Sequence, residues 1–271
     1  MGTPGTGAEE RGRQLAKAVE PLLLTDLEID LRDLSPSLLI SGFFNGFLQQ
    51  DGGNIASALR NQRGGIQVKE YPHINGWSGV GGIPVYVFNK LDGSSVRCEV
   101  DRKGNLTKFG KRNGLLDDQT PFLREAETLI PQKYGDEFAR IVRKERWERA
   151  TFYMEFWGPG SFAGAHVAEQ HDVTLFDVAP HKKGFMEPRD YLRMFGHLDI
   201  AALLHQGNFT HDVADMVSNG TLEGMSYEGV VAKGSWDNKR GMPLMFKWKH
   251  VEWLKKLRGI CKDEAEYNLR C

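Results

Sequence analysis

The sequence predicts an α+β fold in which antiparallel sheets are flanked by helices, with a helical extension before them. Up to about residue 70, apolar residues recur at helical spacing. From residue 83 onward, short apolar runs alternate with turn residues, as strands do, and helical patterns are inserted among them. This mixture favours antiparallel sheets around inserted helices. We therefore expect a helical N-terminal extension over residues 1–75 and a mixed α+β domain over residues 76–271.

The N-terminal extension contains a succession of helical patterns. Residues 8–24 place leucines and a valine near one face, although Pro21 weakens the last turn. Ser35 followed by Pro36 is typical of a helix start, and a run of apolar residues follows it. A shorter pattern continues through Arg60 and ends at a pair of glycines.

The first strands are expected to form an antiparallel meander. Residues 85–90, 95–101 and 106–110 read as strands, and residues 103–105 (KGN) read as the turn between the last two. A long helical region is expected to follow over residues 120–147, broken near the Tyr-Gly pair at 134–135. Further strands are expected at 151–157, 173–178, 228–233 and 244–249, and further helices at 188–195, 210–218 and 251–258.

The charge of the chain does not by itself identify a partner. The net charge of the 271 residues is −1, and 40% hydrophobic and 26% charged content fit a globular protein with a core. Basic residues nevertheless cluster within residues 102–112, 140–149 and 247–258. Each cluster could bind a phosphate backbone or be only a solvated face.

Cysteine use and hydropathy indicate an intracellular, cytoplasmic protein with no membrane partner. Cys98, Cys261 and Cys271 are odd in number and widely spaced, which predicts neither a disulfide framework nor a zinc site. A reducing compartment is the simple interpretation. No apolar run reaches the roughly 18 residues that a membrane span needs.

The first motif with chemical content lies where a predicted strand ends. Residues 89–94 read NKLDGS and follow the apolar run 85–88. Burial disfavours an ammonium group, so Lys90 is either paired or held ready to lose its proton and act as a nucleophile. Alone, a Lys-x-Asp-Gly pattern occurs often by chance.

Four further motifs follow on predicted strands. Each alone has an ordinary explanation, because strand-end carboxylates are usually solvated, aromatic residues usually belong to the core, and lysines on edge strands discourage aggregation. Together with Lys90, and in this order, they form a specific set. They are Glu155, Phe176, Glu228 followed by Gly229, and the pair Lys247 and Lys249.

This ordered set resembles the motifs of the covalent nucleotidyltransferase superfamily, which comprises ATP-dependent DNA ligases, RNA ligases and mRNA capping enzymes. The resemblance covers about residues 83–250. It implies a nucleotidyltransferase (ligase adenylation) fold for residues 76–271. Because the chain ends shortly after Lys249, we expect no OB-fold.

Details of the motifs are most similar to phage-type RNA ligases. Ser94 follows the Lys-x-Asp-Gly motif, and Asp177 follows Phe176, as in that group. DNA ligases and capping enzymes more often have an arginine at the position of Ser95; here Arg97 comes later. The resemblance implies an RNA-repair enzyme, cellular or encoded by a virus or phage, that joins 5′-phosphate and 3′-hydroxyl RNA ends.

Three alternatives stay open at this point. The chain could be a minimal DNA or nick-sealing ligase core acting on nicked duplex or DNA, a capping-type guanylyltransferase, or a nucleic-acid-binding module without catalysis. The sequence does not determine the oligomeric state.

The resemblance also assigns roles. It implies ATP and Mg²⁺ (or Mn²⁺) as cofactors, with Lys90 forming lysyl-AMP and Lys247 and Lys249 assisting. Glu228 would bind the metal, helped by Asp92 and Glu155. Glu155 would also reach the ribose, and Phe176 would stack on adenine. The expected nucleotide contacts are Asn89, Lys90, Asp92, Arg97, Arg112, Glu155, Phe176, Lys233, Lys247 and Lys249.

An uncharged amine is needed for the first transfer, whereas a free lysine has a pKa of about 10.4. We expect the neighbouring cations Lys247 and Lys249, together with a metal ion, to lower the pKa of Lys90.

Overall fold

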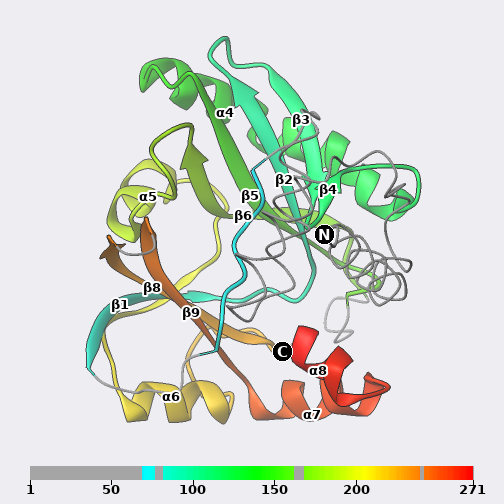
Figure 1. The fold of residues 1–271 in the computed structure, drawn as a ribbon, viewed down its shortest axis with the longest axis vertical. Helices are drawn as coiled ribbons and strands as arrows, with labels where there is room; N and C mark the ends of the chain where they lie inside the picture. Colours follow the sequence, from blue (N-terminus) through cyan, green and yellow to red (C-terminus); the bar gives the residue numbers. More distant parts are fainter. Residues whose placement is uncertain (1–68, 77–81, 162–167, 239–240, 271) are drawn as a thin grey trace, which may run out of the picture. The chain divides into compact units, whose positions relative to one another are not determined.

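The computed structural model describes residues 69–76, 82–161, 168–238 and 241–270 (Figure 1). These residues belong to one contact unit, Gln67–Cys271. They form two antiparallel sheets flanked by helices, which confirms the predicted fold class. The helices expected in the N-terminal extension lie outside the described residues, so the extension and its boundary remain predictions.

The first sheet has four strands in the order β7-β1-β8-β9. Helix α6 (His211–Ser218) covers one face of it, where Val213 and Val217 pack against Val85 and Val87. The Thr210 side chain caps this helix by accepting a hydrogen bond from the Val213 amide. The strands are β1 (Ile83–Asn89), β7 (Leu203–Phe209), β8 (Gly229–Asp237) and β9 (Met242–Lys249).

The second sheet has five strands in the order β4-β3-β2-β5-β6. They are β2 (Ser94–Asp101), β3 (Leu106–Lys111), β4 (Gly114–Leu115), β5 (Arg149–Trp157) and β6 (Asp172–Pro180). The remaining helices are η2 (Pro121–Glu125), α4 (Ala126–Lys144), α5 (Pro188–Phe195), α7 (Val251–Ile260) and α8 (Glu264–Arg270). None of the described helices is both long and apolar enough to cross a membrane.

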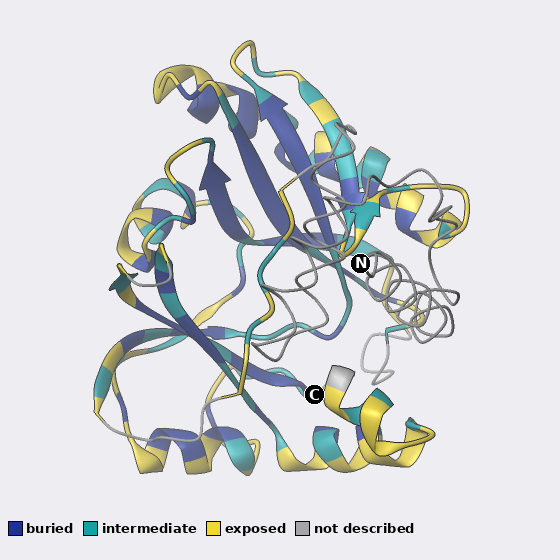
Figure 2. Ribbon diagram, viewed as in Figure 1, coloured by how far each residue is buried: buried dark blue, intermediate teal, exposed yellow. Residues whose placement is uncertain are grey.

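The larger core lies on the second sheet (Figure 2). Helix α4 turns Tyr134 and Phe138 toward the sheet, and the Phe138 ring stacks on Phe152 of β5 with centroids 3.8 Å apart. Strand β1 contributes to both cores, because successive side chains of a strand point to opposite faces. Its valines pack under α6, whereas Phe88 joins the core of the second sheet.

Two predictions about local structure are wrong. Strand β1 pairs with β7 and β8 and not with β2, so the expected three-strand meander is limited to the β2–β3 hairpin. Residues 90–93 instead carry the chain from one sheet to the other. Helix α4 also continues through Tyr134 and Gly135, because burial of the Tyr134 ring and its hydrogen bonds to the Val173 and Asp199 carbonyls outweigh the roughly 1 kcal/mol cost of a helical glycine.

Candidate active site

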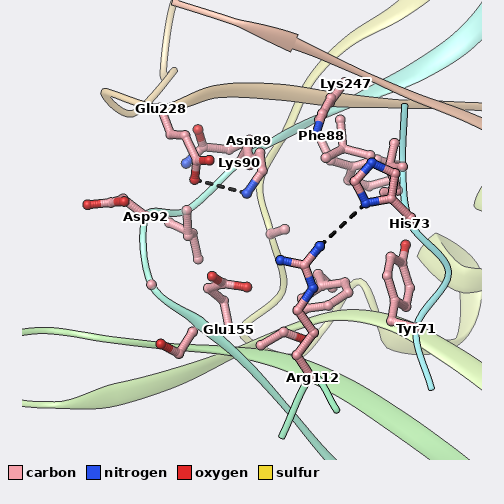
Figure 3. A pocket seen from close by; sticks show the side chains of 18 of the residues that line it. Tyr71, His73, Phe88, Asn89, Lys90, Asp92, Arg112, Glu155, Glu228 and Lys247 are labelled. Atoms are coloured by element: carbon pink, nitrogen blue, oxygen red, sulfur yellow. Dashed lines mark hydrogen bonds and ion pairs between the residues drawn. The ribbon is translucent and has the colours of Figure 1, made fainter. Parts of the chain in front are cut away.

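A cavity of about 540 Å³ lies between the two sheets (Figure 3). Its wall is formed by the end of β1 and the loop after it, by β5, β6, β8 and β9, by helix α7 and by residues 71–74. The structure brings nearly all the predicted site residues together here. Those in the wall are Asn89, Lys90, Asp92, Arg112, Glu155, Phe176, Glu228, Lys233, Lys247 and Lys249.

The backbone of Lys90 is fixed by the segment that leads into β8. The Lys90 amide donates to the Gly229 carbonyl at 3.0 Å, and the Lys90 carbonyl accepts from the Ser226 hydroxyl at 2.8 Å. The Asn89 side-chain oxygen accepts from the Ser226 amide at 2.8 Å. These hydrogen bonds hold the backbone of Lys90 in place, so its side chain extends from a fixed position.

Glycines make this close approach possible. A Cβ on Gly93 would lie 2.3 Å from the Phe156 carbonyl oxygen, so no other residue fits without moving β5. Gly229 has φ +130°, and a Cβ there would lie 2.3 Å from the Trp248 carbonyl oxygen. The glycines of the Lys-x-Asp-Gly and Glu-Gly motifs are therefore required by backbone packing beside the site.

Glu228 joins two lysines from different strands. Its Oε2 lies 2.9 Å from Lys90 Nζ, and its Oε1 accepts a hydrogen bond from Lys249 Nζ. Burial raises the pKa of the Glu228 carboxyl, but Lys90 and Lys249 outweigh it and hold the pKa below its ordinary value. Burial lowers the pKa of Lys249 to about 8, against the opposing effect of Glu228.

The expectation that Lys247 and Lys249 lower the pKa of Lys90 is wrong, whereas the contribution expected from a metal ion stays a prediction. Burial does lower the pKa of Lys90, but the nearby carboxylates of Glu228, Glu155 and Asp92 together raise it above the ordinary lysine value. The expectation considered the cations near Lys90 but not the effect of the three carboxylates on its pKa. The surrounding carboxylates therefore favour the charged form of Lys90.

Glu155 experiences the same acidic surroundings. It lies on β5 opposite Ser95 of β2 and faces the cavity. The pKa of its carboxyl is raised to about 7. Burial is the largest cause, Glu228 and Asp92 also raise the pKa, and Lys90 partly opposes them. This carboxyl can therefore exist in either form near neutral pH, unlike a surface glutamate.

Cations occupy another part of the wall (Figure 3). Arg112 Nη2 lies 3.4 Å from Nδ1 of His73, and Lys247 lines the same cavity. Burial lowers the pKa of His73, and so do Lys247 and Arg112. Fixed positive charge beside a cavity suits an anion such as a phosphate group.

Phe176 forms an aromatic part of the cavity wall, next to the buried ion pair of Lys233 and Asp177. Lys233 Nζ donates to the Phe176 carbonyl at 2.7 Å and to Asp177 Oδ2 at 2.9 Å. The Tyr71 hydroxyl also donates to Asp177 Oδ2, at 2.9 Å, and the Tyr71 ring meets Phe176 edge-on at 5.0 Å. The exposed fractions of Lys233 and Asp177 are 4% and 1%, so the Lys233 ammonium has a buried carboxylate partner.

Arg97 is the one predicted site residue outside the wall of the cavity. It is buried, and its guanidinium donates to the carbonyls of Lys111, Arg112 and Gly114. Burial lowers the pKa of Arg97. Its position gives no support to the expected phosphate contact; Arg97 instead supports the turn that presents Arg112.

Two parts of the wall were missed by sequence reasoning. Residues 69–76 run beside β9, where the Lys247 amide donates to the Asn75 carbonyl at 3.1 Å, and they supply Tyr71 and His73. Helix α7 supplies Trp253 and Leu257. The adjacent Tyr-Pro-His triplet at 71–73 and the i, i+4 spacing of Trp253 and Leu257 were the available signals.

The described residues contain no group of three or more histidine, cysteine or acidic side chains that could hold a metal ion. The predicted ligand Glu228 is paired with two lysines. Mg²⁺ usually binds one or two carboxylates together with substrate phosphates and water, so binding of a metal at Glu228, Asp92 and Glu155 stays a prediction.

Comparison with known proteins identifies the fold. No protein-family model matches the chain, and no curated protein sequence matches it. The solved structures that are similar include RNA ligase from Naegleria gruberi. One mutant of that ligase, with ATP and Mn, gives a TM-score of 0.54 at 15% identity, over 70% of this chain and 59% of that chain.

Two further structures of the same ligase are similar. A mutant without ligand gives a TM-score of 0.51 at 16% identity, over 81% of this chain and 71% of that chain. A third, with ATP and Mn, gives 0.50 at 17% identity, over 65% of this chain and 52% of that chain. The chain thus spans little more than half the length of the ligase in the first and third of these structures, at 59% and 52%. At these identities the likeness shows the fold alone, and the described residues share the fold of these ligase structures.

Asp177 should be important for stability. In the Asp177→Ala variant Lys233 keeps a buried charge without its carboxylate, and the Tyr71 hydroxyl loses an acceptor. We expect the free energy of unfolding, measured by urea denaturation, to fall by about 3–5 kcal/mol. The double variant Asp177→Leu/Lys233→Met should recover a large part of this loss because it leaves no unpaired charge. A loss below about 1 kcal/mol in the single variant would argue against this network.

Glu155 should titrate near neutral pH. NMR titration of ¹³C-labelled carboxyl groups in the nucleotide-free protein should give a midpoint of about 7 for the resonance that Glu155→Gln removes. Because the folded-state pKa lies above the unfolded one, the folded state binds more protons between these values. Stability should therefore fall as the pH rises through this window, and less so in Glu155→Gln. A midpoint at or below the ordinary glutamate value would contradict the buried acidic site.

Proposed function

We propose that the protein is an ATP-dependent RNA ligase that joins 5′-phosphate and 3′-hydroxyl ends through a lysyl-AMP intermediate. The observation that carries this proposal is the position of Lys90. It directly follows strand β1 at the wall of the cavity, its Nζ lies 2.9 Å from Glu228 Oε2, and it shares that carboxylate with Lys249. The five motifs that resemble nucleotidyltransferases meet at this one cavity.

In the first transfer, Lys90 Nζ would attack the α-phosphorus of ATP. A nitrogen–phosphorus bond forms, the bond between the α-phosphorus and the bridging oxygen breaks, and pyrophosphate leaves. The amine must give up its proton first, although the surrounding carboxylates favour the charged form. Lys249 and Lys247 lie in the same wall and would stabilise the charge that develops on the α-phosphate.

The two sides of the cavity fit the two ends of a nucleotide. Phe176, held edge-on by Tyr71, offers a surface on which adenine could stack. Glu155 would accept hydrogen bonds from the ribose. Arg112 and His73 would bind the outer phosphates. Neighbours in fold were solved with ATP and Mn, which supports ATP as the nucleotide.

Glu228, Asp92 and Glu155 are the residues that would hold Mg²⁺ or Mn²⁺ together with nucleotide oxygens. When bound, such an ion would add positive charge beside Lys90 and the α-phosphate, which favours the uncharged amine and the leaving pyrophosphate. The chain's own contribution is to present these carboxylates from the loop between β1 and β2, from β5 and from the residue before β8.

The later transfers would act on RNA ends. A 5′-phosphate oxygen would take AMP from Lys90, and a 3′-hydroxyl would then attack the activated 5′-phosphorus and expel AMP. RNA is favoured over DNA by Ser94 after the Lys-x-Asp-Gly motif and by the RNA ligases among the neighbours in fold. A nick-sealing enzyme that acts on DNA is the alternative within the same chemistry.

Covalent labelling tests the first transfer. With Mg²⁺ and α-labelled ATP, the wild-type protein should become labelled, and Lys90→Ala should reduce labelling by at least about three orders of magnitude because the nucleophile is gone. Lys255→Ala is the matched control: it removes an exposed lysine of α7 that pairs with Glu252, and should label normally.

The other outcomes separate the alternatives. Labelling of Lys90→Ala at the wild-type rate would sink the lysyl-AMP proposal. A wild-type protein without label would favour a nucleic-acid-binding module, and preferential labelling by GTP would favour a capping-type enzyme. Ligation of 5′-phosphorylated RNA against nicked DNA would then decide between RNA and DNA ends.

A further inference from the structure

Helix α7 forms the part of the cavity wall next to Lys249. The helix starts at Val251, immediately after β9, and turns Trp253 and Leu257 toward the cavity one helical turn apart. Their exposed fractions are 4% and 1%, so both side chains are buried in the wall. No motif in the sequence assigns these residues a role.

Trp253 holds the lysine that pairs with Glu228. Lys249 Nζ lies 3.8 Å from the centroid of the Trp253 ring, and the same ammonium donates to Glu228 Oε1. An ammonium over the face of a tryptophan is attracted by about 0.5–2 kcal/mol, more when it is desolvated. Lys249 is 8% exposed, so its ammonium lies between an aromatic face and a carboxylate with little water around it.

The tryptophan is itself held in place. Trp253 and Leu257 form a small core with Tyr227, Leu254 and the following helix α8. Arg258 of α7 pairs with Glu264 and lies 3.8 Å over the Tyr267 ring, both on α8. The two C-terminal helices thus hold the indole ring against Lys249.

We propose that Trp253 is a positioning residue that places the Lys249 ammonium for phosphoryl transfer. The four-carbon stem of lysine is flexible, and a rigid ring fixes its end where it meets both Glu228 and the cavity. The inference rests on the proposed function, in which Lys249 stabilises charge on the α-phosphate. It adds that helix α7 is part of the catalytic architecture.

The expected effect is on the chemical step rather than on nucleotide binding. In single-turnover labelling with ATP and Mg²⁺, Trp253→Leu should lower the maximal rate of self-adenylylation by about 3- to 30-fold, the rate equivalent of the cation–π attraction. The ATP concentration for half-maximal rate should change little, because Phe176, Glu155 and Arg112 are untouched. Trp253→Phe keeps an aromatic face and should retain most of the rate.

A double-mutant cycle separates positioning from folding. In a Lys249→Ala background, Trp253→Leu should cause almost no additional loss, because the residue that it positions is already gone. Trp147→Leu is the matched control: Trp147 is 6% exposed in the larger core and outside the cavity wall, and its loss should lower stability without changing the rate per folded protein.

Three results would overturn the inference. They are an unchanged rate in Trp253→Leu, equal losses in Trp253→Phe and Trp253→Leu, and a Trp253→Leu loss that is the same with and without Lys249. If Lys249→Ala is too slow to follow, the contrast between the phenylalanine and leucine variants decides. A wild-type protein that takes no label would instead contradict the proposed function itself, and the inference with it.

Discussion

The ion-pair chain from Lys90 through Glu228 to Lys249 is the interaction on which the rest of the site depends. A buried carboxylate is costly unless its charge is matched, and here one carboxylate serves two ammonium groups. The three residues come from the end of β1, the start of β8 and the end of β9. The chain of charges can therefore form only when the first sheet is assembled, which couples the site to the fold.

This arrangement has a consequence for when the proposed chemistry can start. Burial lowers the pKa of Lys90, but Glu228, Glu155 and Asp92 together raise it above the ordinary lysine value, which favours the ammonium form. A ligand that brings positive charge close to Lys90 would oppose these carboxylates and favour loss of the Lys90 proton. Under the proposed function, a metal ion held by Glu228 and the nucleotide would supply positive charge beside Lys90 and favour the uncharged amine. The cations elsewhere in the wall, including Arg112, suit the anionic part of such a ligand.

Much of the site could be predicted because its motifs are short and lie where strands end. The alternation of apolar residues located several strands. Gly93 and Gly229, which follow Asp92 and Glu228, are needed because the backbone of a neighbouring strand lies too close for a side chain. The balance of charge at Lys90 was not predictable, since it depends on which side chains converge in space. The position of Arg97 was not predictable for the same reason: a basic residue near a motif can equally support a turn, as Arg97 does here. The spacing of Trp253 and Leu257 marks one helix face, but the contact between Trp253 and Lys249 depends on how α7 packs against β9, which that spacing does not specify.

Under the proposed function, Lys90 carries AMP. Mass spectrometry of peptides after incubation with ATP and Mg²⁺ tests it most directly. The account predicts one AMP group, on the peptide that contains Lys90, attached at its side-chain nitrogen and removed when excess pyrophosphate reverses the transfer. An AMP group found instead on Lys247 or Lys249, or no adduct on the Lys90 peptide while ligation proceeds, would contradict it.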